Sequence, residues 1–573
     1  MRYVLRYLAP YKRRMALGLT VKISATTVEL FIPYILSHIL KVVVLGESVL
    51  NILLWGGIML LCAALACAGN ITANRMAARV SANFSREMRM ALFEKTLSLS
   101  ASEIDRFTVP SLESRITTDT YNVHNFVSMM QRMGVRAPIL LIGGVTVTLV
   151  MDARLALVMI ALLPFIFVTV FFISKKGIPL YRKVQRSVDG MVRVVREDCT
   201  GIRVIKALSK GDYENRRYDK ENARLSHDER RAGVIMGSVN PIMTMLMNIG
   251  IIGVVALSAF MVDADKSSPE TVVAFMQYFT LISMAMMSVS RIFVMYTKCA
   301  ASARRIEQVM VSESSIRVIP EGKEKPEAEG YITFKEVGFS YIGRGKHLSD
   351  ISFSLKRGEH LGIIGATGSG KSTLIKLLMR FYDADSGEIF IDGRDIRSYT
   401  HGELTSLFGA AMQSDFLYND TIMENIKFAR DISDAAAIRA AKIAQADDFI
   451  SSFADGYNYM LTQKGTNVSG GQKQRILIAR AIAADPDILI LDDSSSALDY
   501  KTDASLRSAL AAELSGTTVI TVAQRVSSVK DCDLIILIDD GKISAMGTHA
   551  ELLLRSPEYK EIADSQMGGA FVE

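Results

Sequence analysis

Six stretches of this sequence are apolar enough, and long enough, to cross a lipid bilayer as helices. They lie at about residues 15–43, 51–73, 133–151, 155–174, 238–262 and 271–294. The hydrocarbon core of a bilayer is about 30 Å thick, so a helix needs about 20 predominantly apolar residues to span it. The sequence therefore predicts an all-α, six-helix transmembrane domain over residues 1–311.

The distribution of positive charge orients these spans. Sixteen Lys or Arg residues lie between residues 175 and 231, whereas the short connections at 44–50, 152–154 and 263–270 hold two between them. Basic residues are enriched in cytoplasmic loops. We therefore predict a multi-pass protein with both termini in the cytoplasm. Because no signal peptide or other targeting feature is recognisable, a bacterial cytoplasmic membrane is the expected location.

Charge and cysteine content argue against two other classes of protein. The net charge of +6 over 573 residues is modest and fits a basic cytoplasmic face, so we expect a lipid bilayer and no nucleic acid as partner. None of the five cysteines forms a CxxC pair. Their spacing suits neither a disulfide framework nor a zinc site, and we expect free thiols.

Two ionisable residues fall within the first predicted span. Lys22 and Glu29 are seven residues apart and share one face of a helix, about 10 Å apart along its axis. Ionisable groups inside a membrane are functional candidates. For Glu29 this suggests a cavity-facing position, whereas the Lys22 ammonium could instead reach the cytoplasmic interface. Neither residue identifies a substrate.

The pattern of the chain changes after the last span. Residues 312–330 are polar, contain two prolines and lack apolar periodicity, which is typical of a linker. Short β runs, glycine turns and amphipathic helices follow. The sequence therefore predicts a second, α/β domain over residues 331–573.

A phosphate-binding loop opens this second domain. The segment from Gly365 to Ser372 fits GxxxxGK[ST], follows an apolar strand and leads into a helix. Backbone N–H groups of such a loop, together with the helix N-terminus, surround phosphates. Lys371 is expected to reach the β and γ phosphates of ATP. The predicted nucleotide-binding residues of the loop are Gly365, Thr367, Gly368, Ser369, Gly370, Lys371, Ser372 and Thr373.

A buried strand further along the chain supplies the expected metal ligand. Residues 486–492 are apolar and end in Asp492. In P-loop NTPases such a carboxylate and the hydroxyl of the P-loop serine hold Mg²⁺. Ser372 and Asp492 are therefore the predicted metal ligands, and the second domain is a P-loop NTPase that uses ATP and Mg²⁺.

The segment Val468-Ser469-Gly470-Gly471-Gln472 resembles the signature motif of the ATP-binding cassette (ABC) family. Other motifs of that family follow in order. Tyr341 matches the aromatic residue that stacks on adenine. Gln413 matches the Q-loop glutamine, which contacts Mg²⁺ and relays to the membrane domain, and Asp499 ends the D-loop.

The resemblance extends over the whole chain, and its domain order is similar to that of ABC exporters. It implies a half-transporter that works as a domain-swapped dimer. It also implies that nucleotide is contacted by Ser469, Gly470, Gly471, Gln472 and Asp499. Residues 114–119 and 201–206 look like the regions around the two cytoplasmic coupling helices of such exporters.

Two positions depart from the family pattern. Asp493 stands where a catalytic glutamate usually activates water, and its side chain is shorter by one C–C bond, about 1.5 Å. Gln524 stands where the family has a histidine, and an amide cannot become a cation. The chain thus resembles the degenerate-site subunit of heterodimeric bacterial multidrug exporters, with Asp493, Gln524 and Gln413 as its catalytic positions.

This resemblance leaves several alternatives open. A homodimeric exporter, a lipid flippase and a non-transporting, nucleotide-gated membrane protein are the competing hypotheses. Soluble ABC proteins that act on ribosomes or DNA are opposed by the six spans. We expect the transported molecule to be small and amphipathic: a drug, a lipid or a peptide.

Overall fold

The computed structural model describes residues 2–44, 46, 49–263, 269–319, 330–341, 345, 347–413, 415–494 and 496–567. The chain forms two compact units. One comprises Met1–Ser98 and Phe107–Ser312, and the other comprises Leu99–Arg106 and Glu313–Glu573. The short segment Leu99–Arg106 therefore packs with the second unit, although it lies between two spans. Most of the predicted linker, residues 320–329, lies outside the described residues.

The described residues of the first unit are mainly helical, and six helical stretches among them are long and apolar enough to cross a membrane. Its main helices are α2 (Lys12–Val44), α3 (Val49–Leu97), α7 (Arg136–Met151), α8 (Ala153–Thr200), α10 (Gly211–Gly237), α11 (Val239–Asp263) and α12 (Pro269–Met310). Shorter helices of this unit are α1 (Arg2–Arg6), α5 (Val109–Ser114), α6 (Thr120–Met129) and α9 (Ile202–Ala207), whereas α4 (Ala101–Phe107) belongs to the second unit except for Phe107.

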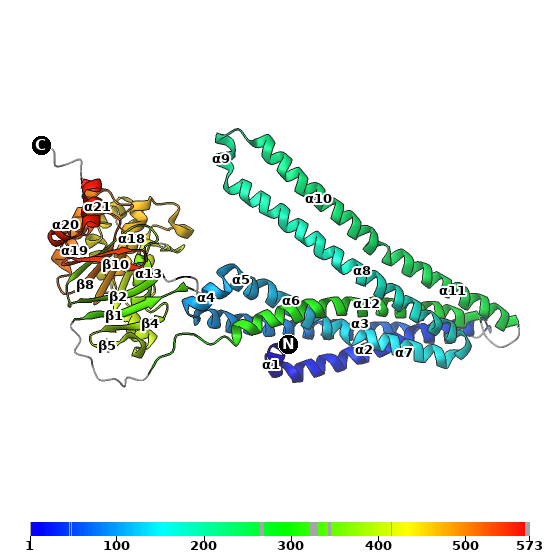
Figure 1. The fold of residues 1–573 in the computed structure, drawn as a ribbon. Helices are drawn as coiled ribbons and strands as arrows, with labels where there is room; N and C mark the ends of the chain where they lie inside the picture. Colours follow the sequence, from blue (N-terminus) through cyan, green and yellow to red (C-terminus); the bar gives the residue numbers. More distant parts are fainter. Residues whose placement is uncertain are drawn as a thin grey trace. The chain divides into compact units, whose positions relative to one another are not determined.

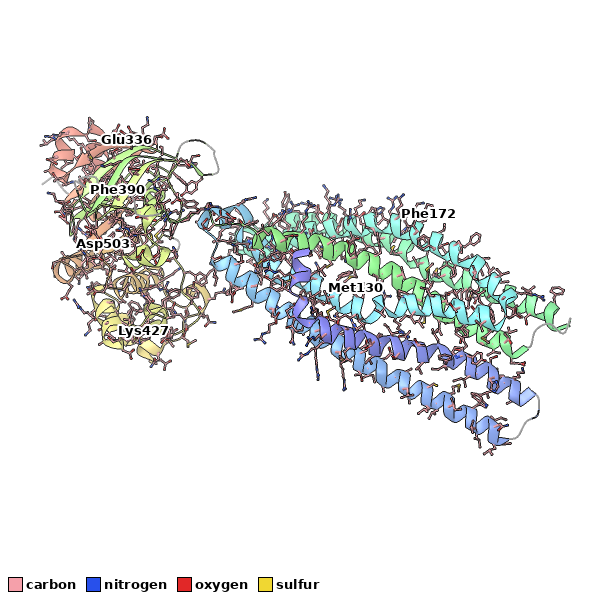
Figure 2. The ribbon with its side chains drawn as sticks, turned by 90° about the horizontal axis from the view of Figure 1, so that it is seen from below. Met130, Phe172, Glu336, Phe390, Lys427 and Asp503 are labelled. Carbon is pink, nitrogen blue, oxygen red and sulfur yellow. The ribbon has the colours of Figure 1, made fainter. Side chains whose placement is uncertain are left out.

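Several of these helices are much longer than a bilayer is thick. At about 1.5 Å per residue, the 49 residues of α3 extend about 70 Å, more than twice the hydrocarbon thickness. Large apolar side chains point outward along the spans, as Phe172 does on α8 (Figure 2). Such side chains suit contact with lipid, and the remaining helix length extends into water.

Helices α8 and α10 pack along each other and form an arm with α9 at its tip (Figure 1). Asp152 caps α8 by accepting hydrogen bonds from the backbone N–H of Arg154 and Leu155. Within the arm, the buried Asp228 accepts a hydrogen bond from Ser187 (2.8 Å) and pairs with Lys183 (2.9 Å). None of the residues of α9 is buried. The predicted second coupling region, residues 201–206, is this exposed tip.

The third span is interrupted twice by π-helical turns. They occupy Arg115–Asp119, between α5 and α6, and Met130–Gly134, between α6 and α7. The predicted first coupling region, residues 114–119, coincides with the first π-turn. Helix α4, which precedes it, is the segment that packs with the second unit. A π-turn widens the helix locally and changes the direction of the side chains that follow it.

Small residues let the spans approach closely. A Cβ atom at Gly69 of α3 would lie 2.8 Å from Cβ of Ala25 on α2, and one at Gly144 of α7 would lie 2.9 Å from Ile282 of α12. The buried Tyr278 of α12 donates a hydrogen bond to the carbonyl oxygen of Leu30 on α2 (2.5 Å). Close packing of this kind replaces the hydrophobic effect as the force between helices in lipid.

The second unit contains two sheets. The four-stranded sheet has the order β2-β1-β4-β5 and is antiparallel, and the six-stranded sheet has the order β10-β9-β3-β8-β7-β6. In the larger sheet all neighbouring strands are parallel except β9 and β10. The strands are β1 (Ile332–Phe339), β2 (Leu348–Leu355), β3 (His360–Ile364), β4 (Ser386–Ile391), β5 (Arg394–Asp395), β6 (Phe408–Ala411), β7 (Ile488–Asp492), β8 (Thr518–Val522), β9 (Leu534–Asp539) and β10 (Lys542–Gly547).

Helices cover the larger sheet and complete an α/β domain. They are α13 (Lys371–Leu378), α14 (His401–Ser406), α15 (Ile422–Lys427), α16 (Asp434–Ile443), α17 (Asp447–Ser452), α18 (Gly470–Ile482), α19 (Tyr500–Glu513), α20 (His549–Arg555) and α21 (Pro557–Met567). Strand β7 is buried along its whole length, as expected of a parallel strand covered on both faces. Six apolar spans followed by an α/β P-loop domain confirm the predicted fold class.

We predict that Gly69→Ala destabilises the membrane unit by about 1–3 kcal/mol, the range for overpacking a close contact. The Cβ of Ala25 cannot rotate away, so α2 and α3 would have to separate. Gly57→Ala is the matched control on the same helix, because a Cβ there meets no atom within 4 Å. Thermal unfolding of the two variants in the same detergent measures the difference. Equal midpoints would contradict the close approach of α2 and α3.

Candidate nucleotide-binding site

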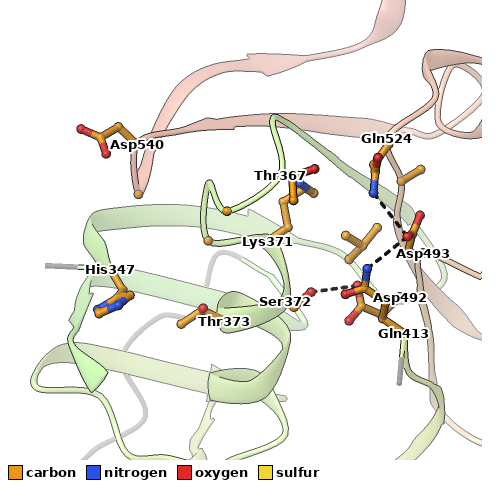
Figure 3. Close-up of a pocket in the computed structure, with 15 residues that line it drawn as sticks. His347, Thr367, Lys371, Ser372, Thr373, Gln413, Asp492, Asp493, Gln524 and Asp540 are labelled. Atoms are coloured by element: carbon orange, nitrogen blue, oxygen red, sulfur yellow. Dashed lines mark hydrogen bonds between the residues drawn. The ribbon is translucent and has the colours of Figure 1, made fainter. Parts of the chain in front are cut away.

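The carboxyl ends of four parallel strands meet at one edge of the larger sheet. Strand β3 leads into the phosphate-binding loop, β6 is followed by Gln413, β7 ends in Asp492, and β8 is followed by Gln524. Ligands of open α/β sheets bind at this edge. A cavity of about 340 Å³ lies here, lined by His347, Thr367, Gly368, Gly370, Lys371, Ser372, Thr373, Gln413, Asp492, Asp493, Val522, Ala523, Gln524, Asp540 and Gly541 (Figure 3).

Two glycines shape the loop that begins the cavity. A Cβ at Gly365 would lie 2.1 Å from the carbonyl oxygen of Ile538 on β9. Gly370, with φ of 111°, occupies a conformation that other residues rarely adopt, and α13 begins directly after it. The loop therefore brings backbone N–H groups and the start of α13 to one side of the cavity, where they suit an anion.

Lys371 and Ser369 are two polar residues of this loop. The Lys371 ammonium donates hydrogen bonds to the carbonyl oxygens of Gly365 (2.8 Å) and Ala366 (2.7 Å). Burial lowers the pKa of Lys371, while Asp493 and Asp492 act to raise it. The hydroxyl of Ser369 is buried and has no hydrogen-bond partner within the described part of the chain. Ser369 belongs to the loop but does not line the cavity.

The expected metal ligands lie next to each other. Ser372 donates a hydrogen bond from Oγ to Oδ1 of Asp492 (3.2 Å; Figure 3). The Asp492 carboxyl is 2% exposed, and its burial raises its pKa, while the Ser372 hydrogen bond acts in the opposite direction. A carboxylate and a hydroxyl are hard oxygen ligands, which Mg²⁺ prefers. The residues present therefore fit Mg²⁺ held between protein oxygens and substrate phosphates.

The two departures from the family pattern lie beside these ligands. Asp493 accepts hydrogen bonds on the same oxygen, Oδ2, from the side-chain amides of Gln413 and Gln524, each at 3.3 Å (Figure 3). Its backbone has φ of 51° and is fixed by a hydrogen bond from its N–H to the carbonyl of Val522 (2.9 Å). Gln413, Asp493 and Gln524 thus form one hydrogen-bonded group at the cavity wall.

Tyr341 lies beside the cavity and does not line it. Its hydroxyl is 3.4 Å from Oγ1 of Thr373, and its ring packs edge-on against Phe339, His347 and Tyr382. The side chain of His347, which does line the cavity, accepts a hydrogen bond at Nδ1 from the backbone N–H of Tyr341 (3.3 Å).

Sequence reasoning missed five residues of the cavity wall: His347, Val522, Ala523, Asp540 and Gly541. The last two form the Asp-Gly turn between β9 and β10, a recognisable hairpin signal. A Cβ at Gly541 would lie 2.5 Å from the carbonyl oxygen of His347, and the Gly541 N–H donates to the backbone carbonyl oxygen of Ser369 (3.0 Å). For His347 the sequence carried no signal, because only the fold brings the start of β2 to the loop.

The signature residues do not line this cavity. Ser469 caps α18 in a reciprocal capping box with Gln472, and Ser469 and Gly470 are exposed. A Cβ at Gly471 would lie 3.1 Å from the carbonyl oxygen of Ala497, which places the signature against the D-loop. Asp499 caps α19. The start of α18 is therefore an exposed helix N-terminus with small residues, accessible to a ligand from outside this chain.

Comparisons with known protein families agree with this architecture. Residues 15–286 match the family described as the ABC transporter transmembrane region, and residues 348–496 match the family described as ABC transporter. The uncharacterized ABC transporter ATP-binding protein YfiB of Bacillus subtilis is 34% identical over 99% of both chains. The chain is an ABC transporter.

Two further comparisons describe its relatives and its fold. The uncharacterized ABC transporter ATP-binding protein Rv1273c of Mycobacterium tuberculosis is 31% identical, covering 99% of this chain and 98% of the relative. The structure of a bacterial Atm1-family ABC exporter with ATP bound aligns with a TM-score of 0.81 at 24% identity, over 97% of this chain and 99% of the other. The transporter therefore has the exporter-type fold.

Membership of the family confirms several predictions made from the sequence. The transporter is a multi-pass cell-membrane protein with a cytoplasmic ATPase domain, and ATP hydrolysis is coupled to transport. Its cofactors are ATP and Mg²⁺. All five cysteines are free in the structure.

We predict that Asp492→Asn raises the thermal stability of the nucleotide-free transporter at neutral pH. Burial raises the pKa of Asp492, so ionisation opposes folding. This destabilisation is present above the raised pKa and disappears as the pH falls through it. The variant removes it at neutral pH, and we expect the midpoint of the ATPase domain to rise by roughly 2–4 °C.

The same variant should reduce stabilisation by Mg²⁺-ATP by more than half, because the metal loses its carboxylate ligand. Thermal unfolding with and without Mg²⁺-ATP measures both effects. The matched control is Asp540→Asn, since Asp540 also lines the cavity but is exposed, and its φ of 43° suits asparagine. If Mg²⁺-ATP stabilised the two variants equally, a metal-binding role for Asp492 would be contradicted.

Proposed function

We propose that this chain is one half of a heterodimeric exporter that moves small amphipathic molecules (drugs, lipids or peptides) out of the cell. In this proposal its phosphate-binding loop belongs to a slow ATP site, and its signature motif completes a fast site on the partner. The observation that carries the proposal is the group formed by Gln413, Asp493 and Gln524, which lacks both side chains that usually act on water.

The binding functions of the site are all represented. Lys371 and the loop from Gly365 to Thr373 are proposed to bind the phosphates, and Tyr341 the adenine. Ser372, Asp492 and Gln413 are proposed to hold Mg²⁺. The neighbouring oxygens of Ser372 and Asp492 and the position of Lys371 and Ser372 in the cavity wall support this assignment. ATP binding at this site therefore needs no residue that the chain lacks.

Activation of water is where the site is weak. The carboxylate of Asp493 is one methylene shorter than that of glutamate, and its Oδ2 accepts two amide hydrogen bonds. Both hydrogen bonds occupy the oxygen that would otherwise take a proton from water. Gln524 donates an N–H but cannot carry the positive charge that histidine can bring to a developing phosphate charge.

The exposed signature supports the second part of the proposal. Ser469, Gly470 and Gly471 keep the residue types that let a helix N-terminus approach a phosphate, and none of them lines the chain's own cavity. Such a surface is useful only to an ATP site on another chain. The arm formed by α8, α9 and α10 likewise ends in residues that are not buried.

Three alternatives remain distinct from this proposal. A homodimer would combine two slow sites, and a homodimeric lipid flippase would share the same site chemistry. A nucleotide-gated, non-transporting protein would bind ATP without substrate-stimulated turnover. The presence of the complete binding set together with the exposed arm favours transport over gating.

We predict that Asp493→Glu combined with Gln524→His raises the ATPase rate of the purified chain by at least tenfold, because general-base catalysis contributes about 10²–10⁴-fold. Phosphate release by the lone chain measures the effect. Addition of Lys371→Ala to the double variant is the control for contaminating ATPases. Ordinary turnover by the unmodified chain, unchanged in the double variant, would show that Asp493 and Gln524 are competent and would contradict the slow site.

We also predict an asymmetry between the two faces of this chain in the complex co-expressed with the product of its neighbouring gene. Gly471→Asp should abolish ATP hydrolysis, because it places a carboxylate opposite the γ-phosphate of the partner's site. Lys371→Ala should leave much of the hydrolysis, since it affects the slow site alone. Gly516→Asp is the control, because a Cβ there meets no atom within 4 Å. In a homodimer both substitutions would abolish hydrolysis.

A further inference from the structure

An ion pair lies inside the membrane unit. Nη2 of Arg136, at the start of α7, is 2.6 Å from Oε1 of Glu29 on α2. Arg136 is 16 residues before Asp152 and Glu29 is 15 residues before Val44, so both lie about 22–24 Å from the outer ends of their helices. This is the inner half of a hydrocarbon core of about 30 Å. Charged groups at such depths face a protein interior or a water-filled cavity.

Arg136 lines a small cavity between α7 and α12. Its volume is about 60 Å³, and its wall includes Met133, Arg136, Leu140, Met284 and Ser288. The side chain of Arg136 is 40% exposed and that of Met284 is 58% exposed. Since one water occupies about 30 Å³ of liquid, the cavity can hold a group the size of a carboxylate. The wall combines flexible apolar side chains with one cation and one hydroxyl.

The backbone around Arg136 is irregular. The π-turn Met130–Gly134 ends directly before α7 (Met130 is labelled in Figure 2). A Cβ at Gly134 would lie 2.9 Å from Cε of Met130, so a larger residue would disturb the turn. π-Turns in membrane and soluble helices occur frequently at functional sites. Here the turn sets the direction in which the first residues of α7 point.

The charges around this cavity do not balance. Arg132 and Arg136 both lie within electrostatic range of Lys22, and Glu29 is the acid among them. Lys22 is buried and donates to Asn70 (2.7 Å) and Asn74 (3.3 Å) on α3. Oε1 of Glu29 is occupied by Arg136, and neither Oε2 of Glu29 nor Nε of Arg136 has a hydrogen-bond partner among the residues described.

These charges favour an anionic ligand over a cationic one. A cationic ligand would meet one carboxylate, Glu29, which is already paired with Arg136, and would approach three positive groups. An anionic ligand would meet a guanidinium that presents several donors in a planar fork. Its apolar part would lie against the methionines, which adapt to different shapes.

We propose that this cavity binds the acid group (carboxylate, sulfonate or phosphate) of an amphipathic transported molecule, and that Arg136 selects anionic over cationic amphiphiles. The proposal deepens the exporter function above and rests on it. Glu29 then holds the guanidinium in place and is not itself a cation site. Arg136 acts as a specificity-determining residue, because it is the cation exposed to the cavity.

The test uses the full-length transporter, in the assembly in which it purifies, reconstituted into phosphatidylcholine nanodiscs. The probes are three fluorescent dodecyl amphiphiles that share fluorophore and chain: a carboxylate, its uncharged amide and a trimethylammonium. Fluorescence anisotropy measures binding without requiring ATP turnover. We expect the carboxylate to bind at least tenfold more tightly than the trimethylammonium, since hydrogen bonds to charged groups are the strong ones.

Four variants test the roles of the two charges. Arg136→Gln combined with Glu29→Gln removes both partners without leaving a buried charge, and should abolish the preference for the carboxylate. Glu29→Gln alone should keep or strengthen carboxylate binding, because it leaves Arg136 unneutralised. Arg154→Gln removes an equal charge at the exposed outer end of the same helical hairpin and should change nothing. Arg136→Lys should restore part of the preference.

The binding preferences of the unmodified transporter and its variants show whether the proposal is right. Absence of carboxylate binding to the unmodified transporter would overturn it, and so would a trimethylammonium preference that depends on Glu29. Repeating the assay with phosphatidylglycerol in the nanodisc distinguishes a transported molecule from a resident lipid. If the lipid displaces the probe and ATP moves no probe across proteoliposomes, the cavity is a lipid site and the proposal is wrong. ATP-driven movement of all three probes alike would leave the exporter function intact and refute only the charge selection.

Discussion

The absence of water from the bilayer core is the constraint on which the membrane unit depends. A backbone N–H or C=O group without a partner there costs several kcal/mol, so the chain must cross the membrane as helices that satisfy their own hydrogen bonds. Helices α3 and α8 continue well past the bilayer without a break. An unbroken helix leaves no backbone N–H or C=O group unpaired at the point where it leaves the membrane. The same constraint explains why irregular backbone is confined to a few places, such as the π-turn Met130–Gly134, which packs against α2, α3 and α12.

In the ATPase domain the equivalent constraint is the geometry of parallel strands. Because their carboxyl ends meet at one edge, residues separated by more than a hundred positions, such as Ser372 and Asp492, become hydrogen-bonded neighbours. The arrangement buries Asp492, which raises its pKa, so its ionised form is expected to oppose folding. A bound cation with phosphates would compensate this effect. Stability and nucleotide binding are therefore coupled at the same residue.

Local patterns carried most of the predictable information. The spans followed from apolar length, and the phosphate-binding loop from glycines, whose spacing reflects a backbone requirement. The contacts that decide selectivity were not predictable in this way. Glu29 was recognised as an ionisable residue in a span, but Arg136 was not, because it is 107 positions away and lies near the polar end of its predicted span. The π-turns also left no periodic signal, since packing against neighbouring helices determines where an extra residue is accommodated.

Both proposals are compatible with a dimer of two different chains, one through its ATP sites and the other through its membrane cavity. If two copies of this chain faced each other, their excess of positive charge would repel across a shared cavity of low dielectric constant. A different partner could supply an acidic or neutral wall opposite Arg136, just as it would supply the groups that Asp493 and Gln524 do not. Pairing two different chains would then serve both sites. Hydrolysis could be concentrated in one cassette, and recognition of charge in one wall of the membrane cavity. On this argument, two residues of the partner chain test the heterodimer equally well. One is the residue that faces Arg136, and the other is the residue that follows the partner's own Mg²⁺-binding aspartate.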